Sequence, residues 1–133
     1  MPIGSYLSGG LDSTILSLLL NPTHTWTVGF EELNEFKWAD IANSKSTSIH
    51  KQVLINHEEF LKMAKQMVSK RKEPLSVPNE VLLYHMTKEV KKANTVVLSG
   101  EGADELFFGY DRIFRWANEL KRPIQLSEFD QYY

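Results

Sequence analysis

Apolar and β-branched residues along the chain gather into four short segments, and stretches with helical spacing lie between them. The segments that we predict as strands are residues 3–7, 24–28, 51–55 and 95–98. Helical periodicity predicts helices over residues 11–20, 35–45, 56–70, 78–93 and 103–120, the last interrupted at Gly109. Because strands alternate with helices, the pattern predicts an α/β fold: a doubly wound parallel sheet of four or five strands.

Local signals support several of these element boundaries. Asn21 and Pro22 end the first helix, because proline cannot continue the hydrogen-bonding pattern of a helix. Asn56, followed three residues later by Glu59, predicts a capping box at the start of the third helix. Pro78 suits the first turn of the fourth helix, where its missing N–H costs nothing.

Some side chains are expected to pack inside the fold. On the helix over residues 35–45, we expect the inner face to carry Phe36, Ala39, Ile41 and Ala42. The three tryptophans, Trp26, Trp38 and Trp116, are expected to be packing residues rather than rings that stack on a base.

Composition narrows the class of protein. The 133 residues suit one domain, with residues 117–133 expected to be peripheral to it. A formal charge of −2 argues against a nucleic-acid binder, and the lack of cysteine excludes disulfides, thiolate metal sites and a cysteine nucleophile. The four histidines show no zinc-site spacing. No apolar run approaches the ~20 residues of a membrane span, so we expect a cytoplasmic protein with no membrane partner.

The loop after the first predicted strand has the features of a phosphate cradle. Its residues are Ser8, Gly9, Gly10, Leu11, Asp12, Ser13 and Thr14. The glycines allow a tight turn and a close approach to a ligand, and the helix that follows presents unpaired N–H groups to an anion. Asp12 would repel a phosphate unless Mg²⁺ lay between them, although it could instead complement the helix dipole. The loop lacks the lysine of a Walker A motif.

A second glycine-bearing loop follows the fourth predicted strand and carries three carboxylates, Glu101, Asp104 and Glu105. Such a cluster indicates a metal and substrate site, because like charges repel without a cation, although a solvated helix start would also tolerate it. We predict the strand order 3-2-1-4. This order makes the first and fourth strands neighbours, so that both glycine loops face one crevice at the switch point.

These two loops also resemble known motifs. Residues 8–13 resemble the PP-loop of the ATP pyrophosphatases, which include asparagine, GMP and argininosuccinate synthetases and tRNA-thiolating enzymes. Residues 97–107, followed by Gly109 and Tyr110, look like the narrower signature of asparagine synthetase and its β-lactam synthetase relatives. Residues 26–30 match the second strand of the family. The resemblance covers about residues 2–115 and implies an adenine nucleotide alpha-hydrolase-like fold.

The resemblance implies roles for particular residues. Leu7 and Val28 would line the adenosine pocket, and the backbone of Ser99 and Gly100 would contact the nucleotide. The residues that would surround the pyrophosphate are Ser8, Gly9, Gly10, Asp12 and Ser13. Asp12 and Asp104 would hold Mg²⁺, Glu101 would support formation of an acyl-adenylate, and Glu105 would assist as a further catalytic candidate.

The implied reaction is amide formation from ATP, an aspartate-like carboxylate and ammonia, in a chain that we expect to be a truncated synthetase domain. The glutaminase domain of the family and its cysteine are absent, so a separate glutaminase chain is an expected partner and a homo-oligomer remains open. The phosphate-binding lysine of the family has no match after Tyr110, and Phe108 replaces a common glycine. The alternatives are a non-catalytic nucleotide-binding module, a β-lactam synthetase-like enzyme or another PP-loop enzyme.

Overall fold

The computed structural model describes residues 2–107, 109–120, 122, 125 and 127. These residues divide into two compact units, of which the first extends to Gly100 and the second begins at Glu101. The first unit holds the sheet and four helices, and the second holds two helices.

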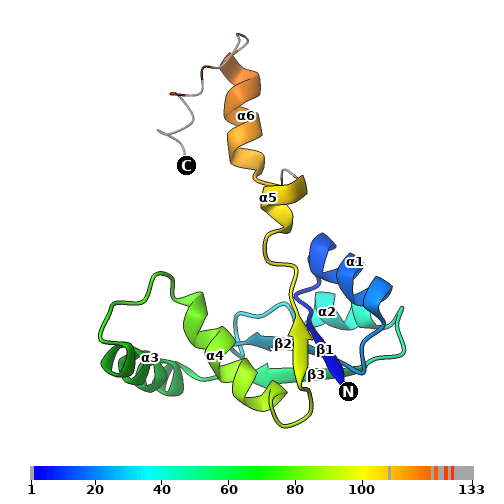
Figure 1. Ribbon diagram of the computed structural model, residues 1–133, viewed down its shortest axis with the longest axis vertical. Helices are drawn as coiled ribbons and strands as arrows, with labels where there is room; N and C mark the ends of the chain where they lie inside the picture. Colours follow the sequence, from blue (N-terminus) through cyan, green and yellow to red (C-terminus); the bar gives the residue numbers. More distant parts are fainter. Residues whose placement is uncertain (1, 108, 121, 123–124, 126, 128–133) are drawn as a thin grey trace. The chain divides into compact units, whose positions relative to one another are not determined.

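A four-stranded parallel sheet forms the centre of the first unit (Figure 1). Its strands are β1 (Ile3–Tyr6), β2 (His24–Gly29), β3 (Ile49–Leu54) and β4 (Val96–Leu98). Their order is β3-β2-β1-β4, and Ser5 of β1 is in register with Thr25 of β2 and with Leu98 of β4. The predicted α/β class, parallel pairing and strand order are confirmed.

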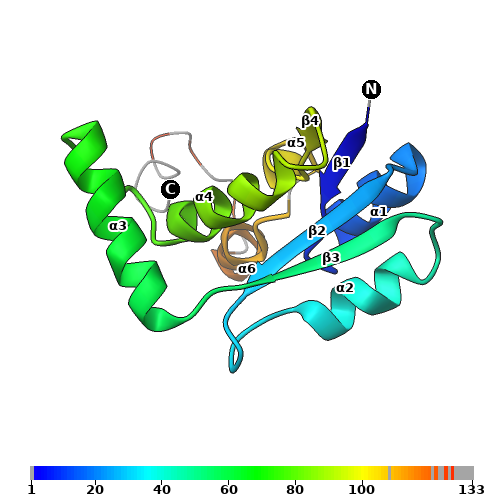
Figure 2. The ribbon, with the colours of Figure 1, turned by 90° about the horizontal axis from the view of Figure 1, so that it is seen from below.

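Helices cover both faces of this sheet (Figure 2). The helices of the first unit are α1 (Leu11–Leu20), α2 (Phe36–Asn43), α3 (His57–Arg71) and α4 (Asn79–Val90). Helices α1 and α2 lie on one face, and α4 packs on the other. In the described part of the second unit, the helices are α5 (Ala103–Phe107) and α6 (Asp111–Leu120), which confirms the predicted interruption at Gly109. Within the described residues, no helix is long and apolar enough to cross a membrane.

The apolar core lies between the sheet and α4. Trp26 of β2 and Val53 of β3 contact Met86 and Val90 of α4, and all four side chains are buried. The Trp26 indole Nε1–H donates a hydrogen bond of 2.9 Å to Asn94 Oδ1, so the polar atom of this ring is also satisfied. The predicted packing role of Trp26 is therefore confirmed.

The opposite face of the sheet is more polar. Ser5 and Ser17 join β1 to α1 by a buried hydrogen bond of 2.9 Å. Ala39 is the fully buried residue of α2, but Ile41 is 52% exposed, so its predicted place on the inner face was wrong. Trp38, predicted to be a packing residue, is 59% exposed. Ile41 lies two residues, about 200°, around the helix from Ala39, which places it on the outer side.

Candidate functional site

The two glycine loops meet within the first unit. Strands β1 and β4 pair in parallel, so the loops that follow them leave the same edge of the sheet. Gly100 lies against the first turn of α1: a Cβ atom at Gly100 would stand 3.2 Å from the Ser13 backbone nitrogen and 3.5 Å from the Asp12 carbonyl carbon. The glycine therefore permits an approach between the two loops that a side chain would crowd.

Two hydroxyl groups shape the loop after β1. The Ser13 hydroxyl donates to the Gly10 carbonyl oxygen at 3.2 Å and lies 2.9 Å from the Ser8 hydroxyl. Because the Ser13 hydrogen is used, the Ser8 hydroxyl must donate to Ser13, and Ser8 in turn accepts from the Gly10 N–H at 3.2 Å. Ser13 Oγ also accepts from the Ser8 N–H at 3.2 Å. These hydrogen bonds within the loop hold the turn in its conformation.

The start of α1 differs from the start of α3. Asn56 caps α3 by accepting a hydrogen bond of 2.8 Å from the Glu59 N–H, which confirms that half of the predicted capping box. Gly10 occupies the same position on α1 and offers no side-chain cap. The first-turn amides of α1 therefore lack the side-chain acceptor that α3 possesses, and such amides favour an anion. Asp12 lies in this first turn with its side chain exposed.

Gly9 holds the loop against α2. Its φ angle of +87° belongs to the left-handed region that glycine adopts without strain. A Cβ atom at Gly9 would lie 2.5 Å from Trp38 Cβ and 2.7 Å from the Ala39 nitrogen. Helix α2 is therefore the support on which this loop rests, a contact that the sequence did not reveal because the two segments are about 30 residues apart.

Comparison with known proteins identifies the family of this chain. A family-wide sequence model described as "Asparagine synthase" matches residues 1–131. The chain is 36% identical to asparagine synthetase [glutamine-hydrolyzing] 1 of Bacillus subtilis, with 98% of this chain and 21% of that protein aligned. It is 38% identical to a putative asparagine synthetase of Mycobacterium tuberculosis, with 96% of this chain and 20% of that protein aligned.

The chain belongs to the asparagine synthase family. It spans about a fifth of the length of these curated relatives. Among solved structures, it is similar to a predicted subunit of tRNA methyltransferase from Methanocaldococcus jannaschii, with a TM-score of 0.50 and 21% identity over 75% of this chain and 53% of that one. At this identity, the structural likeness bears on the fold alone, and it agrees with the doubly wound sheet.

Two residues that the family resemblance assigns to the adenosine pocket lie where β1 and β2 end. Leu7 is buried, and its backbone is held twice: its N–H donates to the Trp26 carbonyl oxygen at 2.9 Å, and its carbonyl oxygen accepts from the Thr27 hydroxyl. Val28 is half-buried at the next strand. Thr27 was not among the predicted site residues, because its role depends on the register between β1 and β2.

The remaining acidic residues of the family signature, Glu101, Asp104 and Glu105, belong to the second unit. Within that unit the Gly109 N–H donates to the Asp104 carbonyl oxygen at 3.0 Å, and the Tyr110 hydroxyl donates to the Glu105 carboxylate. The hydrogen bond from Tyr110 lowers the pKa of Glu105 below its ordinary value, so this carboxylate stays ionised at neutral pH. Phe108 lies outside the described residues.

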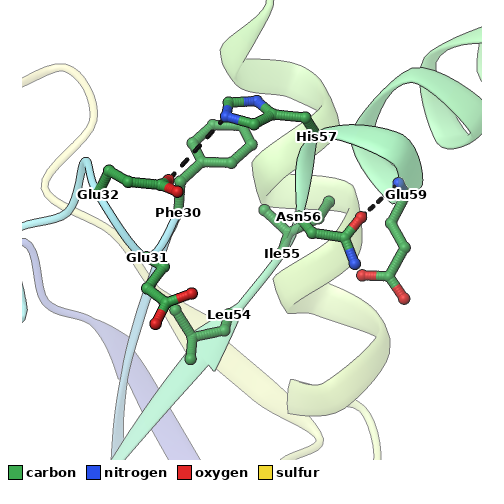
Figure 3. Close-up of a pocket in the computed structure, with 8 residues that line it drawn as sticks. All are labelled: Phe30, Glu31, Glu32, Leu54, Ile55, Asn56, His57 and Glu59. Carbon is green, nitrogen blue, oxygen red and sulfur yellow. Dashed lines mark hydrogen bonds and ion pairs between the residues drawn. The ribbon is translucent and has the colours of Figure 1, made fainter.

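A separate cavity at the ends of β2 and β3 is poorly suited to the phosphates of a nucleotide (Figure 3). Its volume is about 190 Å³, and its lining includes Glu31, Glu32 and Glu59. Phe30 and His57 stack with ring centroids 4.7 Å apart, and His57 Nε2 lies 4.0 Å from the Glu32 carboxylate. Three carboxylates would repel an anion. This cavity is therefore less suited to a phosphate than the uncapped start of α1.

Proposed function

We propose that this chain is the nucleotide-binding part of an ATP-dependent amide-forming synthetase. In the proposed reaction, ATP activates a carboxylate as an acyl-adenylate and pyrophosphate is released. Membership of the asparagine synthase family supports the reaction class. The structural observation that carries the proposal is the contact of Gly100 with the first turn of α1, which brings two glycine loops to one edge of the sheet.

The loop after β1 would bind the phosphates. Amides at the uncapped start of α1 would donate to the oxygens of the departing pyrophosphate, where negative charge develops as the bond to the α-phosphorus breaks. The hydroxyls of Ser8 and Ser13 would exchange their bond to each other for bonds to phosphate oxygens. Ser99 and Gly100 would contact the nucleotide by their backbone, and Leu7 and Val28 would enclose the adenosine.

Carboxylates would provide the charge balance. Asp12 and Asp104 would hold Mg²⁺, and the ion when bound would neutralise charge on the pyrophosphate. Glu101 and Glu105 would support the adenylation step.

We propose aspartate as the carboxylate: its β-carboxylate oxygen would attack the α-phosphorus, and ammonia would then displace AMP at the acyl carbon. We propose that a glutaminase supplies the ammonia and that the reaction takes place in the cytoplasm.

Calorimetric titration with ATP, with and without Mg²⁺, tests nucleotide binding. We expect Asp12→Asn to weaken Mg²⁺-dependent binding at least about tenfold, which corresponds to about 1.4 kcal/mol. Glu58→Gln is the matched control, because Glu58 also lies in the first turn of a helix, but that helix is capped by Asn56. Equal affinities of the two variants, or no effect of Mg²⁺ on the parent chain, would refute the metal role.

A second assay separates an enzyme from a binding module. The alternative function is a non-catalytic nucleotide-binding module. Pyrophosphate release that depends on both aspartate and ammonia would support the complete reaction. Binding of ATP with no release of pyrophosphate would support the module, and absence of binding would refute both functions.

A further inference from the structure

A largely buried imidazole lies between α2 and β3. The side chain of His50 in β3 is only 10% exposed. Its Nε2 atom is fully buried and has no hydrogen-bond partner within the described residues. A buried nitrogen without a partner carries a desolvation cost, so its surroundings call for a physical explanation.

A chain of hydrogen bonds fixes the tautomer of this ring. The Asn43 amide nitrogen donates to the Ser48 carbonyl oxygen at 3.0 Å, so Asn43 Oδ1 must accept. The Thr25 hydroxyl donates to that oxygen at 2.8 Å. The hydroxyl has therefore used its only hydrogen, and it must accept from His50 Nδ1–H at 2.9 Å. In the neutral ring, Nε2 is consequently an unprotonated nitrogen with a free lone pair.

A carboxylate lies close to this nitrogen. Asp40 Oδ1 of α2 lies 3.7 Å from His50 Nε2. Two such acceptors repel each other, and a cation bound between them would remove the repulsion. A zinc ion about 2.1 Å from each of the two ligand atoms would hold those atoms about 3.4 Å apart at the tetrahedral angle and at most about 4.2 Å apart. The observed separation falls inside this range.

Both candidate ligands are also held by hydrogen bonds with neighbouring side chains, as the ligands of metal sites usually are. The Thr25 hydroxyl orients the imidazole of His50. The Gln52 amide nitrogen donates to both oxygens of the Asp40 carboxylate at 3.0 Å. Metal-bound histidines and carboxylates are held by such hydrogen bonds, which fix the ring orientation and the tautomer.

We propose that His50 and Asp40 form a binding site for a divalent transition-metal ion such as Zn²⁺, independent of the proposed nucleotide site. The described residues contain no group of three or more histidine, aspartate or glutamate side chains that could hold a metal, so the protein supplies two ligands. Asp40 is 59% exposed and gives the ion access from solvent, and water completes the coordination. An imidazole nitrogen selects Zn²⁺, Co²⁺, Ni²⁺ or Cu²⁺ over Mg²⁺.

Zinc titration of the 133-residue chain by calorimetry at pH 7.5, without ATP or Mg²⁺, tests this proposal. We expect one bound ion, with the affinity reduced at least about tenfold by Asp40→Asn and by His50→Gln. Thr25→Val is expected to weaken binding about 10–100-fold through loss of the outer hydrogen bond. Asp40 is exposed, so its variant is expected to fold even if a change at the buried His50 disrupts the structure.

His57 and Glu32 provide the matched control, because their side chains form a histidine–carboxylate pair 4.0 Å apart but are 77% and 76% exposed. We expect His57→Gln and Glu32→Gln to leave zinc affinity unchanged. The proposal is overturned if zinc does not bind, or if Asp40→Asn binds as tightly as the parent chain. Neither result bears on ATP binding, so the two proposals fail separately.

Discussion

Replacement of Gly9 by alanine tests whether the loop after β1 depends on its contact with α2. The new Cβ atom would lie 2.5 Å from Trp38 Cβ, about 1 Å inside the ordinary contact distance between carbon atoms. Two backbone atoms, Trp38 C at 2.6 Å and Ala39 N at 2.7 Å, crowd the same position. Relief therefore requires a shift of the loop or of α2, because no flexible side chain can simply move aside.

Two costs add in this variant. A left-handed backbone conformation costs an alanine about 1–2 kcal/mol, and Gly9 has a φ angle of +87°. Overpacking of a close contact costs about 1–3 kcal/mol. We therefore expect Gly9→Ala to lower the free energy of unfolding by about 2–5 kcal/mol.

Urea denaturation followed by tryptophan fluorescence measures this loss, because Trp26 lies in the core of the same unit. Gly10→Ala is the matched control: Gly10 has a φ angle of −67°, and its Cβ atom would meet only Ser8 Oγ at 3.2 Å. We expect this control to lose less than about 1 kcal/mol. If Gly9→Ala is no less stable than Gly10→Ala, the support of the loop by α2 is refuted.

Three further predictions concern stability. Burial lowers the pKa of His50 from its ordinary value of 6.5, so the unfolded chain takes up a proton first as the pH falls. The free energy of unfolding should therefore decrease below about pH 6.5, and in metal-free buffer His50→Gln should flatten that dependence. Asn56→Ala should cost about 1 kcal/mol in urea denaturation through loss of the cap on α3, whereas no change would contradict the capping bond. Trp26→Phe should cost about 1–3 kcal/mol because the buried Asn94 oxygen loses its donor, and restored stability in a Trp26→Phe, Asn94→Leu double variant would support that reason.

The sequence predicted the sheet because each of its signals is local. Alternation of strands and helices along the chain indicated an α/β fold with parallel pairing. The Asn56 cap could be predicted for the same reason, because Glu59 lies only three residues away. Ile41 was misplaced because the neighbouring Ala39, and not the larger side chain, faces the sheet.

Contacts between distant segments could not be predicted from local patterns. The Thr27 hydroxyl bonds to the Leu7 carbonyl oxygen only because β1 and β2 have a particular register. Likewise, His50 and Asp40 lie ten residues apart on different elements, a spacing that matches no metal-binding motif. Their approach depends on how α2 packs against β3.

The proposed function requires that the two glycine loops bind the phosphates of a nucleotide together. Amide NMR spectra recorded during titration with MgATP test it most directly. We expect the largest shifts at Gly9, Gly10, Asp12, Ser13 and Gly100, with little change at the capped start of α3. Shifts that are concentrated instead at Glu31, His57 and Glu59 around the acidic cavity, or no shifts at all, would contradict it.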